Sequence, residues 1–399
     1  MNAINKNYML TSLLFFFAYL FSACVPQESM TPTLTPLPTL VNTPTLPIVE
    51  EEVQPLATGW EVELVVQDLD IPWSVVFPQG NRILIAERTG TIREVVDGVL
   101  NLEAIFSLEE VTAVGEGGLM GMALHPDYDQ NRYVYVCYAT TLGGGMIDRV
   151  VRMVDTPGKM QLDMVILDNI PAARFHAGCR LKFGPDEKLY ITTGDALAPD
   201  LAQDINSLAG KILRINDDGS IPEDNPFPNS LIYSIGHRNP QGISWDWTSG
   251  IMFTSEHGPS GFDGPGGGDE INIIIPGGNY GWPLVSHDEV LEGTINPIIQ
   301  FTPAEAPASL LFYDRDILPF FTGNLFFGAL RGEGVMRLIL DEDGKTIKDF
   351  EKIVSNVGRV REVTIGPDGF IYFTTSNQDG RAAPRVGDDK LFRIIPTFD

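Results

Sequence analysis

Cysteine, histidine and basic residues are all scarce in this chain of 399 residues. It has 3 Cys and 5 His, and 27 Lys and Arg against 53 Asp and Glu, which gives a formal net charge of −26. A surface this acidic repels nucleic acid and anionic membrane, so neither is expected as a partner. The histidines show no HxH or HExxH spacing, which argues against a zinc site built from histidine. Any local cluster of arginines therefore needs its own explanation.

Two of the three cysteines, Cys137 and Cys179, lie in the globular part of the chain. Two cysteines do not imply a disulfide framework, even in an oxidising compartment. We expect both to be small, buried, apolar residues.

The first 24 residues are typical of an export signal of the bacterial lipoprotein kind. An apolar run from Met9 to Phe21 is too short to span a bilayer comfortably and suits a signal peptide. It leads into "FSAC", in which small residues precede Cys24, the expected lipidated N-terminus. The alternative is an ordinary secretory signal with an incidental cysteine. Residues 25–58 form a Pro- and Thr-rich linker. We expect an exported domain, periplasmic or on the outer side of the cytoplasmic membrane, that reaches membrane only through this lipid.

Long helical patterns are also missing beyond Gly59, and a short β-rich unit recurs instead. Each copy has a Pro or Gly turn followed by a strand-like run, as in "GPDEKLYITTGD" from Gly184 and "GPDGFIYFTTSN" from Gly366. Six copies occupy residues 59–399 at an average spacing of about 57 residues, which is typical of propeller blades. Strands are expected at Leu84–Ala86, Leu189–Thr192 and Ile371–Thr374. We predict an all-β, six-bladed β-propeller with four-stranded blades; a large sandwich with repeated tight turns is the alternative.

Four loops carry polar groups that packing does not explain. They are "RFHAGCRL" with His176, "GHRNPQG" from Gly236 to Gly242, the Gly-rich segment from Ser255 to Pro283, and "GRVREV" with Arg359 and Arg361. Turn-formers at both ends of "GHRNPQG" disfavour a regular helix or a central strand there. If "GRVREV" is a strand, its two arginines face the same side and could bind an anion.

Each of these loops also has a plainer structural interpretation. A single His is more often a structural residue than a catalyst, and an RxR pair could be surface charge. The Gly-rich segment could be irregular surface, yet Gly258 and Pro259 could offer backbone carbonyls, and Glu270 a carboxylate, to a hard cation such as Ca²⁺. The stretch "NDDGSIPEDN" from Asn216 does not match EF-hand spacing and is interpreted as a turn.

Together the motifs resemble those of the soluble pyrroloquinoline quinone (PQQ)-dependent sugar dehydrogenases, the glucose/sorbosone dehydrogenase-like propellers, and most of all their aldose sugar dehydrogenase branch. The match runs from "LDIPWSVVF" through "GEGGLMGMALHPDY", "HAGCRLKFGPD", "GHRNPQGISWD" and "NYGWP" to "GALRG" and "GRVREVTIGPDG". It covers nearly the whole globular part. The resemblance implies PQQ- and Ca²⁺-dependent oxidation of an aldose sugar at its anomeric hydroxyl, by hydride transfer to the quinone, with electrons passed to an unidentified external acceptor.

The resemblance also implies roles for individual residues. His176 matches the general base, and Arg238 and Asn239 match the pair at the substrate and the reactive oxygen of the quinone. His237 is expected to support the loop. Positions that bind PQQ match Glu116, Ala329, Leu330, Arg331, Arg359, Val360 and Arg361. Metal positions match Gly258 and Pro259, which would hold Ca²⁺ on PQQ, and Glu270 and Tyr280, which match a further calcium site.

Four departures from the family pattern bear on the cofactor. Glu116 replaces a Gln that contacts PQQ, Arg331 stands where a Lys is usual, Cys179 sits where Gly is common, and no Tyr follows "NYGWP". A non-catalytic glycan- or protein-binding propeller is therefore the alternative function. A calcium-dependent lactonase-type propeller is a further one, but the sequence shows no dense set of Asp, Asn and Glu for its metal cage.

Overall fold

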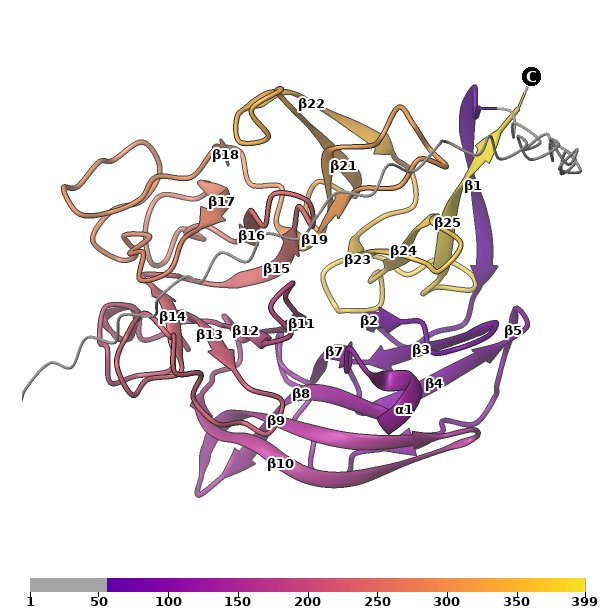
Figure 1. Cartoon of the computed structure of the whole chain (residues 1–399), viewed down its shortest axis with the longest axis horizontal. Coiled ribbons are helices and arrows are strands. Elements are labelled where there is room, and N and C mark those ends of the chain that lie inside the picture. The colour runs from indigo at the N-terminus through magenta and orange to yellow at the C-terminus, as the bar shows by residue number, and fades with distance from the viewer. Residues whose placement is uncertain (1–55, 399) are drawn as a thin grey trace, which may run out of the picture. The chain divides into compact units, whose positions relative to one another are not determined.

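The structure, a computed structural model, describes residues 56–398, which form almost only β-strands. Strand pairing groups them into six antiparallel blades. Figure 1 shows the blades arranged around a common centre, with β2, β7, β11, β15, β19 and β23 nearest to it. The predicted six-bladed β-propeller is therefore confirmed. The propeller is one compact unit, Gln54–Asp399. The predicted signal peptide, Cys24 and nearly all of the linker lie outside the described residues.

Each blade runs outward from the channel in four positions. The innermost strands are β2 (Pro72–Val76), β7 (Leu119–Leu124), β11 (Gly178–Phe183), β15 (Pro240–Trp245), β19 (Pro307–Tyr313) and β23 (Val360–Ile365). The second strands are β3 (Arg82–Glu87), β8 (Tyr133–Leu142), β12 (Leu189–Thr193), β16 (Met252–Glu256), β20 (Asn324–Ala329) and β24 (Ile371–Thr375). The third are β4 (Thr91–Val96), β9 (Gly145–Thr156), β13 (Lys211–Ile215), β17 (Asp269–Ile274), β21 (Gly334–Leu340) and β25 (Leu391–Thr397). The outermost are β5 (Val99–Leu100), β10 (Lys159–Pro171), β14 (Ile232–Ile235), β18 (Ile299–Phe301), β22 (Ile347–Val354) and β1 (Gly59–Val66).

Three short elements complete the described chain: β6 (Phe106–Ser107), which pairs with β4, the helix α1 (Tyr128–Asn131) and a 3₁₀ turn at Pro199–Ala202.

The recurring turn-strand unit in the sequence is the first hairpin of each blade. The three strands expected from it fall within β3, β12 and β24. Second strands such as β12 (LYITT) are buried along their whole length, because blades cover both of their faces. Strands that are covered on both faces require a continuous run of residues that tolerate burial, and not an alternation of apolar and polar residues.

The ring closes by pairing the two ends of the propeller. β1 is the outermost strand of the blade that otherwise consists of β23, β24 and β25. Gly59 pairs with Thr397 and the register continues to Val66 and Leu391. Figure 1 shows the indigo β1 beside the yellow β25. The first and last described strands thus hold the same blade together.

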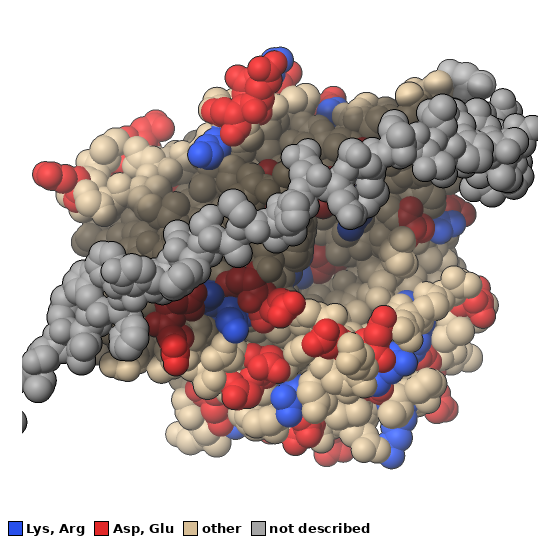
Figure 2. Space-filling model, viewed as in Figure 1, with Lys and Arg blue, Asp and Glu red and all other residues tan. Residues whose placement is uncertain are grey.

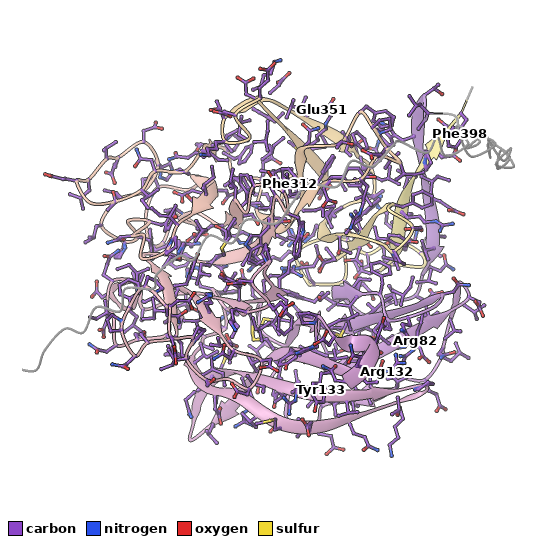
Figure 3. The ribbon with its side chains drawn as sticks, in the orientation of Figure 1. Arg82, Arg132, Tyr133, Phe312, Glu351 and Phe398 are labelled. Atoms are coloured by element: carbon purple, nitrogen blue, oxygen red, sulfur yellow. A yellow bond between two sulfur atoms is a disulfide. The ribbon has the colours of Figure 1, made fainter. Side chains whose placement is uncertain are left out.

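Neighbouring blades are joined by buried side chains. Phe253 of β16 and Phe312 of β19 stack with ring centroids 6.0 Å apart, between blades four and five. Arg82 of β3 donates to Asp155 at the end of β9 at 2.9 Å, between blades one and two. Arg82 and Phe312 are labelled in Figure 3, which shows how side chains fill the spaces between the sheets. Each boundary is therefore a packed interior that fixes the channel's walls.

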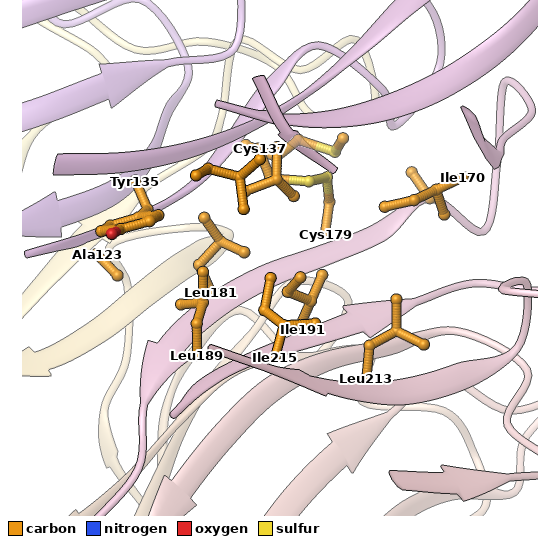
Figure 4. Close-up of a cluster of buried hydrophobic side chains, with 14 of the residues drawn as sticks. Ala123, Tyr135, Cys137, Ile170, Cys179, Leu181, Leu189, Ile191, Leu213 and Ile215 are labelled. Atoms are coloured by element: carbon orange, nitrogen blue, oxygen red, sulfur yellow. A yellow bond between two sulfur atoms is a disulfide. The ribbon is translucent and has the colours of Figure 1, made fainter. Parts of the chain in front are cut away.

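The expectation of two unpaired cysteines is wrong. Cys137 of β8 and Cys179 of β11 form a disulfide across the boundary of blades two and three, with Cα atoms 5.8 Å apart (Figure 4). Both residues are buried, as expected. Their separation of 42 residues carries no pairing signal; only the packing of the two blades brings them together. Closing a loop of this size typically stabilises a protein by about 2–4 kcal/mol.

The second half of "GHRNPQG" also differs from expectation, because Pro240 and Gly242 lie within the innermost strand β15. β15 pairs only with β16, so the missing N–H of Pro240 leaves no gap between two paired neighbours. Gly242 is required here, since a Cβ would lie 2.2 Å from the Ser255 hydroxyl and 2.6 Å from the Leu310 nitrogen. The residues before Pro240 form the predicted loop.

Acidic side chains outnumber basic ones on the face shown in Figure 2, in agreement with the net charge. Within residues 56–398 we find no helix with the length and apolar character needed to cross a membrane.

Candidate active site

A cavity of about 280 Å³ lies at the end of the channel where the innermost strands begin. All six blades contribute to its wall. Ten predicted site residues line it: Glu116, His176, Arg238, Asn239, Gly258, Pro259, Leu330, Arg331, Arg359 and Arg361. The structure therefore brings together residues that are up to 245 positions apart, from Glu116 to Arg361 (361 − 116).

Four predicted site residues do not line this cavity. Ala329 and Val360 are fully buried and pack in two apolar clusters between the blades. They end β20 and begin β23, so they position their neighbours Leu330, Arg359 and Arg361. Glu270 and Tyr280 lie in an adjoining small cavity described below.

His176 is held in a fixed orientation at the wall of the cavity. Its Nδ1 lies 2.7 Å from Oδ1 of Asp195, whose Oδ2 accepts a hydrogen bond of 2.8 Å from the Trp282 indole. In a neutral imidazole, donation from Nδ1 to this carboxylate leaves Nε2 as the acceptor. His176 also has a φ of 58° in the left-handed region, and a Cβ on Gly194 would lie 1.7 Å from its carbonyl oxygen. The backbone is thus strained into place by close packing.

Arg238 and Asn239 lie immediately before β15 and are held by the end of β16 and the segment that follows it. The Arg238 guanidinium donates to Asp263 at 2.7 Å, to the His257 carbonyl at 3.1 Å and to the Ser260 hydroxyl at 3.2 Å. The backbone N–H of Asn239 donates to Glu256 at 3.2 Å. Arg238 therefore offers a cation of set direction, although Asp263 balances part of its charge.

His237 supports this loop, as expected. It is fully buried, and its Nδ1 and Nε2 lie 2.9 Å from Glu256 and 2.8 Å from Ser234. Its ring also stacks on Tyr280 at 4.8 Å. A histidine with both nitrogens occupied inside the protein has no free atom for catalysis.

Glu116 lies among donors on the cavity wall. Its Oε2 accepts from the His176 N–H at 3.0 Å and from the Asn239 amide at 3.1 Å, and its Oε1 lies 3.4 Å from Arg381. Burial alone would raise the pKa of this carboxyl, but the charges of His257 and Arg381 hold that pKa below its ordinary value. Glu116 is therefore an anion that ties the predicted base to the predicted Asn.

Six arginines line the cavity: Arg88, Arg238, Arg331, Arg359, Arg361 and Arg381. Three of them face carboxylates. Asp263 partners Arg238, Asp379 accepts from Arg359 at 2.7 Å and 2.9 Å, and Glu116 faces Arg381. The other three have no carboxylate partner among the described residues.

The unpaired arginines leave buried donors without an acceptor. Arg361 is 3 % exposed and donates to Gln241, but its Nε has no partner among residues 56–398. Burial lowers its pKa to about 9. Arg88 donates to the Gly115 carbonyl, and its Nε is unpartnered in the same way. Unpaired buried cations are costly, so this wall is suited to an anion.

A smaller cavity of about 20 Å³ adjoins the first and is lined by Glu256, Gly258, Pro259, Glu270 and Tyr280. This volume is enough for one occupant of the size of a water molecule. Burial and the neighbouring Glu256 raise the pKa of Glu270 to about 8. The hydroxyl of Tyr280 is occupied by Ile273 and Ile275, so Tyr280 has only its backbone to offer. Within residues 56–398, no group of three or more His, Cys, Asp or Glu side chains could hold a metal ion.

Sequence reasoning missed several residues at or behind the wall: Arg88, Asp195, Glu256, His257, Asp263, Asp379 and Arg381. Four of these end a second strand or follow it within two residues, as in "AERTG", "TTGDA" and "TSEHG". The recurring position was a usable signal, because these strands end at the same mouth of the propeller. Asp263, Asp379 and Arg381 lie farther along loops and gave no such signal.

Comparison with known proteins agrees with this geometry. The chain is 32% identical over 352 residues to aldose sugar dehydrogenase YliI of Escherichia coli, covering 81% of this chain and 93% of that protein. It is 33% identical over 261 residues to quinoprotein glucose dehydrogenase B of Acinetobacter calcoaceticus, covering 57% of this chain and 53% of that protein. The structure of PQQ-bound aldose sugar dehydrogenase from Streptomyces coelicolor aligns with a TM-score of 0.75 at 33% identity, over 86% of this chain and 99% of that one.

The sequence pattern of one protein family covers most of the propeller. Residues 69–385 match the family described as Glucose / Sorbosone dehydrogenase. The matched segment includes every residue of the cavity wall named above. The chain therefore belongs to the glucose/sorbosone dehydrogenase family.

Proposed function

We propose that the protein is a PQQ-dependent dehydrogenase that oxidises an aldose sugar at its anomeric hydroxyl and passes the electrons to an external acceptor. The family and the PQQ-bound relative support a sugar dehydrogenase of the PQQ type. The observation that carries the proposal is the set of buried guanidinium nitrogens of Arg88 and Arg361 that lack an acceptor beside the cavity. PQQ is a tricarboxylate, so its charge suits the three arginines that no carboxylate within residues 56–398 pairs with.

The residues of the cavity divide into those that would bind PQQ and those that would act on the sugar. Arg88, Arg331 and Arg361 would hold the carboxylates of PQQ, with Arg359 beside them. His176 would accept the proton of the anomeric hydroxyl at Nε2, while Asp195 keeps its ring in place. Arg238 would oppose the negative charge that grows on the reacting oxygens. Bound PQQ would supply the two-electron acceptor for the hydride of the anomeric carbon.

Reconstitution tests this function directly. Purified protein should gain quinone absorbance and dye-linked oxidation of an aldose after PQQ and Ca²⁺ are added. A protein that neither binds PQQ nor oxidises any of a panel of aldoses would reject the proposal and favour a non-catalytic propeller.

Replacement of Glu116 by Gln is expected to tighten PQQ binding by about tenfold, because it removes a carboxylate that repels the cofactor. The Gln oxygen can still accept from His176 and Asn239, as Oε2 of Glu116 does. Arg381 would then be free to face PQQ. Titration of PQQ into both proteins by intrinsic fluorescence measures the change. Weaker binding in the variant would show that the Glu116–Arg381 pair positions the cofactor instead.

We also propose that Ca²⁺ binds in the small cavity and on PQQ. Glu256 and Glu270 would supply hard oxygen ligands, and Gly258 and Pro259, which line both cavities, would add backbone carbonyls. Ca²⁺ should raise the melting temperature, since a ligand at 100 times its Kd adds about 2.7 kcal/mol of stability. Glu270→Gln should abolish most of this gain, while Glu292→Gln at an exposed site should keep it. An equal calcium shift in Glu270→Gln would exclude the small cavity as the site.

We propose further that the protein is exported and anchored by lipid on Cys24. The support is the apolar run that ends in "FSAC" and the Pro- and Thr-rich linker after it. Mass spectrometry of protein from its native host should show cleavage before Cys24 and an acylated thiol. An unmodified Cys24 or cleavage elsewhere would reject the anchor.

A further inference from the structure

A second cavity, of about 400 Å³, lies at the opposite end of the channel. Its wall comes from the later residues of the innermost strands of all six blades. It shares no lining residue with the first cavity. Trp73 is 1 % exposed between them, with the guanidinium carbons of Arg180 and Arg361 at 4.1 Å and 5.6 Å from its ring centre. The two cavities are therefore separate sites.

A buried guanidinium with a free donor is part of the wall of this second cavity. Arg180 is 5 % exposed, and its Nε donates to the Gln241 carbonyl at 2.9 Å. One terminal nitrogen bonds Glu362, and the other, Nη2, has no partner within residues 56–398. A buried donor of this kind costs free energy until an acceptor reaches it.

Lys182, two residues farther along β11, lines the same cavity. No hydrogen bond or ion pair of its ammonium group is present among the described residues. Burial lowers its pKa to about 8, and the nearby charge of Glu362 offsets this lowering only in part. Arg315 adds a third cation at the rim, paired with Asp314 at 3.5 Å. Glu362 is the one carboxylate in the wall as described, and Arg180 already engages it.

Most of the remaining wall is apolar. The same cavity that Arg180 and Lys182 line is also bounded by Phe77, Leu124, Phe183, Leu310 and Ile365. A fully hydrated inorganic anion would leave these side chains without a partner. A ligand that satisfies both parts of the wall carries one anionic oxygen group and a hydrocarbon body.

We propose that this cavity binds a monocarboxylate with a hydrocarbon body, whose carboxylate accepts hydrogen bonds from Nη2 of Arg180 and from Lys182. The apolar wall covers the hydrocarbon portion. Because this cavity shares no lining residue with the first one, the proposed site is independent of PQQ and of the proposed sugar oxidation. Arg180 keeps a free donor beside its ion pair with Glu362, and Lys182 has no partner among the described residues, so this wall holds a local excess of cations in a chain of net charge −26.

Calorimetric titration of the full-length protein with octanoate tests the proposal. We expect one site per chain, and binding weaker by at least about tenfold for methyl octanoate, which lacks the charge, and for inorganic phosphate, which lacks the hydrocarbon. Lys182→Gln should weaken octanoate binding by about tenfold or more, since a hydrogen bond to a charged group is lost. Lys182→Arg should retain it. Lys348→Gln removes the same charge from an exposed position on β22 and should change nothing.

Several results would overturn the site. Octanoate that fails to bind at millimolar concentration excludes it. Equal affinity in wild type and Lys182→Gln shows that the ligand lies elsewhere, and equal affinity for phosphate rejects the hydrocarbon requirement. The unfolding temperature of each variant without ligand shows whether that variant is folded. If Lys182→Gln does not fold, the octanoate affinity of Lys182→Arg still tests the site.

Discussion

His176→Gln protein is expected to bind PQQ normally and to oxidise sugar about 10²–10⁴ times more slowly, the usual contribution of a general base. Gln has nearly the size of His and can still donate to Asp195, but it lacks the basic Nε2. The loss should fall on kcat, because His176 would act on the proton of the sugar and not on the carboxylates of PQQ. Steady-state kinetics at saturating PQQ, together with a PQQ titration, separates the two effects.

His125→Gln is the matched control. His125 is a partly buried histidine on blade two that accepts a hydrogen bond from the backbone N–H of Asp127 and does not line the cavity. This variant should keep full turnover. If His176→Gln turned over every active sugar at a near-native rate, the assignment of the base would be wrong.

Arg361→Met is expected to weaken PQQ binding by about 10- to 100-fold while leaving the cofactor-free protein no less stable. The two effects have opposite signs because Arg361 is buried with an unpartnered Nε and a lowered pKa, so its charge costs free energy until an anion binds. Sugar oxidation should recover at high PQQ concentration. A PQQ titration measures the change in affinity, and thermal unfolding without cofactor measures the change in stability.

Arg359→Met provides the contrast. Arg359 is bound to Asp379 and to the Leu330 carbonyl, so its removal leaves a buried carboxylate unpaired. We expect this variant to lose stability without cofactor. If Arg361→Met lost as much stability as Arg359→Met, the view that the charge of Arg361 is uncompensated until an anion binds would be wrong.

The architecture was predictable because it repeats. One hairpin signal, a Pro or Gly turn before a β-rich run, occurs in every blade, and six copies leave few arrangements other than a propeller. The strand that contains Pro240 and Gly242 was not expected from the sequence. Turn-forming residues are tolerated in an innermost strand that has one unpaired edge and a close neighbour, and neither property is visible in a short sequence window.

The site was predictable only where it coincides with motifs. His176 and Arg238 stand in distinctive segments. Asp195, which orients His176, lies 19 residues away in an ordinary loop, and Asp263, which orients Arg238, lies 25 residues away in the Gly-rich segment, where no pattern marks its position. The Cys137–Cys179 disulfide was not predicted for the same reason. Its partners meet across a blade boundary, and no spacing rule describes that boundary.

The closure of the ring by β1 and β25 also determines when the protein can function during its synthesis. Thr58 and Thr397 are hydrogen-bonded across 339 positions, so the last blade cannot be completed until Thr397 has been synthesised and has left the ribosome. Arg359, Arg361 and Arg381 are among the last parts of the cavity wall to be made. A nascent or prematurely terminated chain would therefore carry His176 and Arg238 but lack the cations beside them. A chain in which this cavity is whole has therefore already closed its last blade.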